Sequence, residues 1–468
     1  MTTPAGELDE SLHISRPGDA VTAAAAYEQK KRRLTDFLRA HRGGNIRLGK
    51  NTSNLFRDRR EIPAQRLDVR DFNEVLRVDA AAGYVEAEGM TPYVKLVAEC
   101  LKYNVMPAVV PQLKSITLGG ATVGCGIESS SFRYGLVHET VREMEILLGN
   151  GSAVLCTPDN EHSDLFYGFP NSYGTLGYAL KLKAKVVPVK KYVKLSHLHF
   201  TEPQSYFAEL ARQCGRQEVD FVDGVIFGRN EMVISVGQFV DRAPYTSDYT
   251  YEKIYYKSLR ERAEDFLTTE DYIWRWDTDW FWCSKNLLAQ NPLVRRLYGR
   301  ARLNSITYTK IMRWNSRWKL SHYLDKLRGV RSESVIQDVE IPIEGAPDFL
   351  AFYFDTVRFM PVWICPTRAY DANVKFDLYD MEAETLYVNF GFWDVIRGST
   401  KLPPGYYNRR IEEKVLALGG MKSLYSDSYF TPEQFWKIYN KPGYDKLKKK
   451  YDPDGTLKDI YRKCVLKE

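Results

Sequence analysis

The glycine-rich segment Val110–Gly135, VPQLKSITLGGATVGCGIESSSFRYG, constrains the fold more than any other part of the sequence. Glycine lets a backbone come close to a ligand and turn its N–H groups inward, and serine hydroxyls add further donors. This chemistry suits a pyrophosphate. The loop Arg47–Asn54 has the same character, and two such loops could hold a dinucleotide from both sides. Glycine content alone is equally consistent with a tight turn in a β-rich domain.

Several common site types are excluded by pattern. No G-x-G-x-x-G joins a first strand to a helix with an acidic residue about 20 positions later, and no GK[ST] occurs, so neither a Rossmann fingerprint nor a Walker A loop is present. The seven cysteines and seven histidines are dispersed without zinc spacing, so we expect no metal site and mostly buried, reduced thiols.

Charge and hydropathy narrow the class of protein further. The 468 residues carry 66 Lys+Arg and 60 Asp+Glu, a balance that argues against a nucleic-acid binder. Residues 1–19 are polar and acidic, unlike a secretory signal, and no apolar run of about 18 residues predicts a transmembrane helix. We therefore expect a cytoplasmic location. No pattern indicates an oligomeric state.

Hydrophobic periodicity predicts a mixed α+β fold. Thr91 reads as an N-cap before Pro92, and Gly149-Asn150-Gly151 reads as a hairpin turn. The expected helices cover residues 23–40, 92–101, 201–214, 346–355, 432–439 and 444–450. The expected strands cover residues 74–79, 84–88, 141–148, 152–156, 180–186, 221–227, 232–240, 334–343, 360–365 and 385–390.

Ordered sequence blocks then carry a family resemblance. They include Thr117–Gly120, Gly124–Ser131 with Tyr134-Gly135, Gly174–Gly177, Pro188–Leu195 and Pro361–Pro366. Together they resemble the FAD-binding domain of the vanillyl-alcohol-oxidase, or PCMH, type. Within that superfamily the chain is most similar to the Δ24-sterol reductase (Diminuto-like) family, and a bacterial relative acting on fatty acyl methylene groups is implied.

The resemblance implies a PCMH-type FAD domain of two subdomains, a ferredoxin-like α+β cap and a helical C-terminal tail. The expected division is a flexible N-terminus at 1–20, the FAD domain at 21–190, the cap or substrate domain at 191–415, and a segment at 416–468 that returns to the FAD domain. Because the first loop contains no His, we expect the FAD to be bound non-covalently. The residues expected to bind it are Gly49, Lys50, Asn51, Thr52, Ser53, Gly119, Gly120, Gly124, Gly126, Ser129, Ser130, Tyr134, Gly135, Gly174 and Gly177.

The implied activity is an FAD-dependent oxidoreductase that saturates a lipid C=C bond, with NADPH as the electron donor. The sequence leaves a methylene-branched fatty acyl chain of a phospholipid slightly ahead of a sterol Δ24 bond, because the polar start of the chain lacks the membrane segment of the eukaryotic sterol reductases. An FAD oxidase or dehydrogenase of a sugar or alcohol and a non-catalytic lipid-binding protein are the alternatives. The candidate proton donors are Glu128, Tyr407 (beside Tyr406), Gln337 and Asp338.

The aromatic segment Tyr272–Trp282 has two interpretations. It is either the aromatic core of the cap or a surface at a membrane interface, where Trp and Tyr are favoured. A basic cluster follows it at Arg295, Arg296, Arg300, Arg302, Lys310 and Arg313, which is either a solvated face or a patch for anionic lipid. A lipid substrate favours peripheral contact with the inner face of the membrane.

Overall fold

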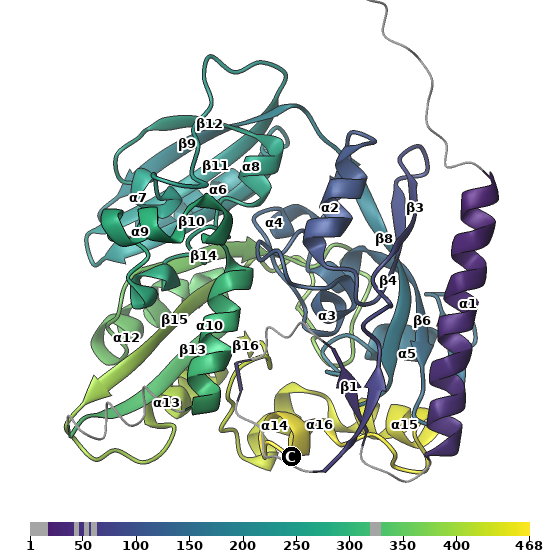
Figure 1. Cartoon of the computed structure of the whole chain (residues 1–468). Coiled ribbons are helices and arrows are strands. Elements are labelled where there is room, and N and C mark those ends of the chain that lie inside the picture. The colour runs from purple at the N-terminus through teal and green to yellow at the C-terminus, as the bar shows by residue number, and fades with distance from the viewer. Residues whose placement is uncertain (1–16, 42–45, 51–55, 58–62, 319–328) are drawn as a thin grey trace, which may run out of the picture.

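The computed structural model describes residues 17–41, 46–50, 56–57, 63–318 and 329–468. It combines helices with two large antiparallel sheets that lie beside each other (Figure 1), so the predicted α+β class is confirmed. Among the described helices, none combines the length and apolar character that crossing a bilayer requires.

The first large sheet has six strands in the order β3-β4-β8-β6-β7, with β5 also paired to β8. Val85, Leu182, Ala184 and Ile146 are fully or almost fully buried in its core, because inward residues alternate with outward Lys and Glu. The strands are β3 (Val75–Asp79), β4 (Tyr84–Glu88), β5 (Val105–Pro107), β6 (Val141–Leu147), β7 (Ala153–Cys156) and β8 (Tyr178–Pro188). The helices around it are α2 (Tyr93–Leu101), α3 (Leu118–Val123), α4 (Ser131–Tyr134) and α5 (Ser163–Gly168).

The long helix α1 (Pro17–Ala40) covers the outer edge of this half (Figure 1). Its buried Leu34 and Leu38 share a core with Leu67 and Phe72, beside the small parallel pair β1 (Ile46–Gly49) and β2 (Gln65–Asp68). The structure thus differs from two expectations. The helix already begins at Pro17 rather than after residue 20, and Arg47–Gly49 form a strand rather than part of a loop.

The second large sheet has eight strands in the order β12-β9-β11-β10-β14-β15-β13-β16. Two βαββ units build its centre, β9-α6-β10-β11 and β13-α12-β14-β15, and in each unit the third strand lies between the first and the second. The two units join through β10 and β14. The strands are β9 (Tyr192–Phe200), β10 (Phe221–Gly228), β11 (Glu231–Val240), β12 (Glu264–Thr268), β13 (Arg331–Pro342), β14 (Val362–Thr367), β15 (Tyr387–Gly398) and β16 (Met421–Lys422).

Different sets of helices lie on the two faces of the eight-stranded sheet. Helices α6 (Pro203–Cys214), α12 (Ala346–Thr356) and α13 (Tyr406–Ala417) pack there on a core that includes Val335, Val339 and Phe390. The opposite face receives the aromatic segment, the short helices α7 (Tyr255–Ser258), α8 (Thr269–Ile273) and α9 (Pro292–Tyr298), and the longer helix α10 (Ser305–Trp318). The site shared with the six-stranded half lies on this face.

The C-terminal helices α14 (Pro432–Ile438), α15 (Lys441–Tyr451) and α16 (Ile460–Cys464) pack below the six-stranded half (Figure 1). The Nζ of Lys450 lies 2.8 Å from an Asp164 carboxylate oxygen of α5. The Nζ of Lys463 donates to the carbonyl of Tyr173 at 2.7 Å. The end of the chain thus contributes directly to the region around the glycine-rich loops.

The predicted cap at Thr91 is wrong. The Thr91 hydroxyl donates to the carbonyl of Glu74 at 3.0 Å instead of accepting from the helix, and Pro92 is the residue that precedes α2. Thr91 thus bonds to the backbone just before β3 rather than to its own helix. The predicted hairpin at residues 149–151 is confirmed by the pairing of β6 with β7.

Candidate functional site

A cavity of about 510 Å³ lies between the two large sheets, within the range of ~300–1,000 Å³ typical of cofactor and ligand sites. One side, the glycine-rich wall, comes from the six-stranded half and consists of Gly89, Gly119, Gly120, Gly124, Gly126, Gly174 and Gly177. The other side, the aromatic wall, comes from the eight-stranded sheet and the aromatic segment and consists of Trp280, Phe281, Trp363 and Trp393 with Asp338 and Glu340.

The glycines let backbone segments approach one another closely. A Cβ atom on Gly119 would lie 2.7 Å from the carbonyl oxygen of Gly89, which itself accepts from the Gly119 N–H at 2.9 Å. The Gly120 N–H donates to the Thr117 hydroxyl, and the Gly126 N–H to the carbonyl of Ala121. The expectation that these N–H groups point at a ligand is therefore wrong for these three glycines. Their contribution to the wall is a thin, smooth backbone surface.

The predicted cofactor residues divide into three groups. Lys50, Gly119, Gly120, Gly124, Gly126, Gly174 and Gly177 line the cavity. Gly49, Ser129, Ser130, Tyr134 and Gly135 are not among its lining residues. Asn51, Thr52 and Ser53 lie outside the described residues.

Two residues of the second group, Ser130 and Gly135, have structural roles instead. The Ser130 hydroxyl donates to the carbonyl of Ala108 at 2.7 Å. Gly135 has φ +69°, and a Cβ there would collide with the Glu139 carboxylate, which accepts from the Leu136 N–H at 2.7 Å. These residues hold the turn that follows the wall, which explains their small side chains without ligand contact.

Polar groups suited to a dinucleotide surround the glycine-rich wall. The cations Arg47, Lys50, Arg57, Lys458 and Lys463 all line the cavity. Burial and the nearby Arg47 charge lower the pKa of Lys458, a like-charge arrangement that a bound pyrophosphate would relieve. The side chain of Gln112 is 3% exposed and lines the cavity, and its Nε2 has no partner among the described residues. An amide donor buried in this way calls for a ligand acceptor, so the donor set fits FAD.

The aromatic wall is dense and apolar. Phe281 packs on Trp393 with ring centroids 4.5 Å apart and on Trp363 at 5.3 Å. Trp276 and Trp282 are at most 1% exposed, so the aromatic segment is a core and its interpretation as a membrane-interface surface is wrong. Burial is possible because its charged members are paired: Arg275 with Asp223 at 2.8 Å and Asp279 with Arg295 at 2.7 Å.

Two acids of β13 face the cavity from this wall. Asp338 accepts from the Tyr425 hydroxyl at 2.7 Å and from the Asn389 amide at 3.0 Å, and burial raises the pKa of its carboxyl to about 6. Glu340 accepts from the Tyr379 hydroxyl, and burial raises the pKa of Glu340 to about 8. Carboxyls that keep a proton near neutral pH can act as general acids.

Gly391 makes room for the first of these acids. It pairs with Asp338 across β13 and β15, and a Cβ on it would lie 2.7 Å from both the Asp338 Oδ1 and the Trp393 ring. The Trp393 Nε1 donates to the Tyr425 hydroxyl at 2.8 Å, which donates onward to Asp338. Asp338 is thus held in one orientation beside the aromatic rings.

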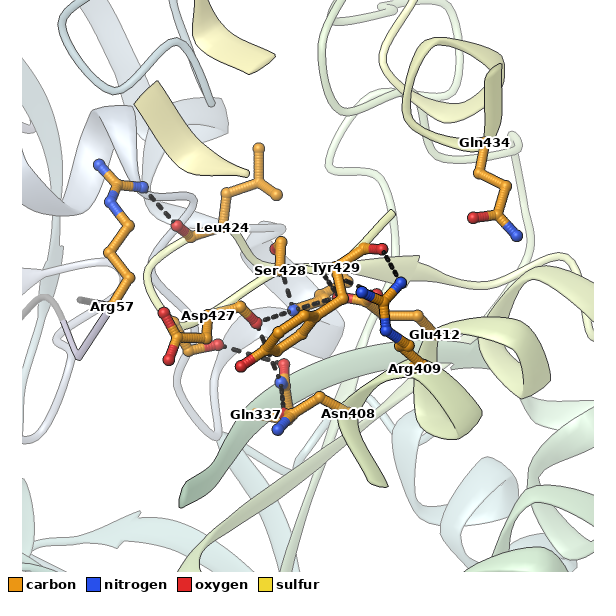
Figure 2. A network of polar contacts seen from close by, with 12 residues as sticks. Arg57, Gln337, Asn408, Arg409, Glu412, Leu424, Asp427, Ser428, Tyr429 and Gln434 are labelled. Carbon is orange, nitrogen blue, oxygen red and sulfur yellow. Dashed lines mark hydrogen bonds and ion pairs between the residues drawn. The ribbon is translucent and has the colours of Figure 1, made fainter. Parts of the chain in front are cut away.

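Gln337, although adjacent to Asp338, points to the opposite face of the sheet because side chains alternate along a strand. Figure 2 shows it in a polar network with Asn408 and Asp427: its Nε2 donates to the Asn408 Oδ1 at 2.5 Å and to the Asp427 carbonyl at 3.3 Å. Tyr407 lies in α13 and packs against the core on that helix-covered face. Neither residue lines the cavity, so the structure gives no support to their predicted catalytic roles.

Glu128 also lies outside the cavity lining, in a buried network behind the glycine-rich wall. Its Oε1 accepts from Arg275 Nη2 at 3.1 Å and from the Ser129 hydroxyl. Burial raises the pKa of Glu128 to about 7, opposed by the Arg275 charge. Through Arg275, which also pairs with Asp223, this network fastens the loop after the glycines to the eight-stranded half.

Sequence reasoning missed Gln112, Arg57, Glu340, Tyr425 and Lys458. A usable signal existed for one of them: Glu340 follows Asp338 by two residues on a predicted strand, so both side chains share a face. Gln112 lies inside the glycine-rich segment itself, but no pattern marks it there. Arg57, Tyr425 and Lys458 reach the cavity from other segments, where no local pattern marks them either. Within the described residues, no group of three His, Cys, Asp or Glu side chains is placed to hold a metal ion.

Comparison with known proteins agrees with the site. Residues 25–157 match a family model described as an FAD binding domain. The chain is 28% identical over 403 residues to the Delta(24)-sterol reductase of Homo sapiens, covering 83% of this chain and 76% of that protein. It is 25% identical over 442 residues to the Delta(24)-sterol reductase of Arabidopsis thaliana, covering 85% and 76%. A cytokinin dehydrogenase of Oryza sativa is 27% identical over only 31% of this chain. The chain thus carries an FAD-binding domain, and its predicted resemblance to sterol reductases is confirmed.

Proposed function

With this FAD-binding domain as the premise, we propose that the protein is an FAD-dependent oxidoreductase that reduces a carbon–carbon double bond of a lipid, with NADPH as electron donor. One observation carries the proposal: the aromatic wall presents two carboxyls, whose pKa is raised to about 6 and about 8 by removal from water, to the same cavity that the glycine-rich wall lines. A reductase of an isolated alkene needs a proton donor in a water-poor, apolar pocket beside the flavin.

Bound reduced FAD would supply the hydride for one alkene carbon. Asp338 supplies the proton for the other carbon, so that one hydride and one proton add across the double bond. Tyr425 and Asn389 hold the Asp338 carboxyl in place. Glu340, on the same face of β13, keeps its proton to a higher pH and is the second acid of the site.

The lining of the aromatic wall supports an apolar substrate. Phe281, Trp363 and Trp393 exclude water, and the neighbouring Leu287 and Met312 extend the apolar lining. A methylene-branched fatty acyl chain and a sterol side chain both suit this apolar lining, and we propose that the enzyme acts at the cytoplasmic face of a membrane, where such lipids and NADPH meet. A sugar or polyol would leave its hydroxyls without partners along these rings.

We further propose that FAD is held without a covalent bond. No His is among the described residues that line the cavity. Cys125 lines it, but burial raises the pKa of its thiol well above the usual range and disfavours the reactive thiolate.

The experiment is a turnover assay of the purified, FAD-loaded protein with NADPH and detergent-dispersed lipids. We expect a product two hydrogens heavier from a methylene-branched acyl lipid or from a Δ24 sterol, and acid precipitation should release the yellow chromophore into the supernatant. Reduction of dye or O₂ with alcohols, and no lipid product, would instead identify the oxidase alternative. A protein that cannot take up FAD would contradict the proposal altogether.

A further inference from the structure

Four large apolar side chains stand out on the surface. Leu288, Leu293, Leu297 and Trp314 are 68%, 72%, 82% and 58% exposed, more than any other large hydrophobic residue in the described part of the chain. All four lie within the 27 residues of segment 288–314, in or beside helices α9 and α10. We call this segment the apolar–basic surface. Leu293 and Leu297 are four residues apart on α9 and share a face of that helix, and adjacent exposed apolar side chains of this kind mark a contact surface.

Helix α9 is inverted relative to an ordinary surface helix. Its Arg295 is 3% exposed and donates from Nη1 and Nη2 to both Asp279 oxygens at 2.7 and 2.9 Å, while Leu293 and Leu297 face outward. The Asn291 side chain caps the helix by accepting from the Leu293 N–H at 3.0 Å. The exposure of the leucines is therefore fixed by buried partners and by a cap.

The same region is rich in cations. Residues 280–318 contain eight Lys or Arg and no Asp or Glu, although Lys285, Arg295, Arg296 and Arg300 pair with Asp394, Asp279, Glu252 and Asp248 of other segments. Arg302 and Lys310 are exposed cations of the same segment as the apolar side chains. Apolar side chains rimmed by cations match an anionic bilayer surface, and the shared positive sign disfavours a second copy of the chain on this face.

The apolar–basic surface is continuous with the cavity at one point. Leu287 lines the cavity and Leu288 is exposed, and Asn286 both lines the cavity and is exposed, so the cavity opens there. Met312 of α10 also lines the cavity, whereas the exposed Trp314, two positions further along the helix, lies on another side of it. Figure 1 shows α10 on the side of the eight-stranded sheet that faces the glycine-rich half.

We propose that the apolar–basic surface docks on an anionic lipid bilayer and opens the cavity directly to it. Leu288, Leu293 and Leu297 enter the acyl boundary, and Arg302 and Lys310 contact the headgroups. The inference rests on the proposed lipid reductase function, because it supplies the route by which a membrane lipid reaches Asp338.

The test is flotation of the FAD-loaded protein with vesicles of phosphatidylcholine alone or with one third phosphatidylglycerol. We expect the protein to bind the anionic vesicles. The variant Leu293→Glu/Leu297→Glu should bind them at least tenfold more weakly. The variant Arg302→Ala/Lys310→Ala should bind them more weakly by about fivefold per cation removed, and its binding should depend less on salt. Leu155→Glu, a 48% exposed leucine on the six-stranded half, is the matched control and should bind like the unchanged protein.

Activity on detergent-dispersed lipid separates this proposal from the proposed function. The Leu293→Glu/Leu297→Glu variant should keep its FAD and its turnover of dispersed substrate while losing turnover of vesicle substrate. Unchanged flotation of that variant, equal binding to neutral vesicles, or a shift of the oligomeric state on substitution would overturn the docking proposal. Absence of turnover in detergent, with vesicle binding intact, would overturn only the proposed reductase function.

Discussion

The glycine-rich wall of the cavity is made of backbone and small side chains, whereas the wall from the eight-stranded sheet is made of indole rings and carboxyls. On the first, substitution is limited by distance: Gly119 and Gly89 approach so closely that a single methyl group does not fit. On the second wall, substitution is limited by the need for a carboxyl that can carry a proton, because Asp338 and Glu340 lie where burial favours the neutral acid. The comparison teaches that one wall holds a cofactor by its shape and the other acts on a substrate by its chemistry. Substitutions in the first wall should therefore weaken FAD binding, and substitutions in the second should lower turnover without loss of FAD.

The largest separation is expected from Asp338→Asn. The change keeps the shape of the side chain and removes its acid, so turnover should fall about 100-fold or more while bound FAD stays stoichiometric. Steady-state kinetics and flavin absorbance measure the two. Asp394→Asn is the control, because Asp394 lines the same cavity but pairs with Lys285 at 2.8 Å, and it should cost less than threefold. Full turnover of Asp338→Asn would remove Asp338 from the acid role.

The pH dependence tests the same wall without a substitution. The pKa of Asp338 is raised to about 6, so half of its carboxyl groups carry a proton at that pH, and the proton-donating form predominates below it and is lost above it. In the FAD-loaded protein, kcat should therefore fall up to tenfold per pH unit above about pH 6 if Asp338 is the only acid. If kcat instead begins to fall near pH 8, the proton donor is Glu340, whose pKa is raised to about 8.

Gly119→Ala should damage the opposite wall. The added Cβ would lie 2.7 Å from the Gly89 carbonyl, and relief of that overlap should cost about 1–3 kcal/mol in the free energy of unfolding and weaken FAD binding. Thermal unfolding and FAD titration measure the effect. Gly228→Ala is the matched control and should leave stability nearly unchanged, since nothing lies within 4 Å of a Cβ there. Equal melting temperatures for the two variants would show that the close approach is not limiting.

The smallest effect is expected from Glu128→Gln. Arg275 keeps its ion pair with Asp223 at 2.8 Å, and Glu128 does not line the cavity, so turnover and FAD content should stay within about threefold. A loss comparable to that of Asp338→Asn would mean that the network behind the glycine-rich wall takes part in the chemistry.

Local patterns predicted most of the elements and one side of the site. Alternation along residues 180–186 and glycine between residues 147 and 153 are short-range signals, and β8 and the β6–β7 hairpin follow them. Gln337 and Asp338 were both expected at the site, although a strand can direct only one of two neighbours to a given face. That rule was available from the sequence; which face meets the cavity was not.

The aromatic segment could not be interpreted from its sequence because its burial depends on distant partners. Arg275 is neutralised by Asp223, 52 residues away, and its Nη2 also donates to Glu128, 147 residues away. Without those carboxyls, a segment so rich in Trp that also carries an Arg is equally typical of a membrane interface. The exposed leucines of α9 show the converse, since an ordinary amphipathic pattern would have buried them.

The placement of Arg47 and Lys458 beside each other has a consequence for biosynthesis. Both line the cavity, yet 411 residues separate them, and Lys463 and Glu468 join them there. During synthesis on a ribosome, the glycine-rich wall is complete long before its last cations emerge. Loading with FAD should therefore be a late, post-translational event, and a nascent chain stalled before residue 458 should be folded in part but colourless.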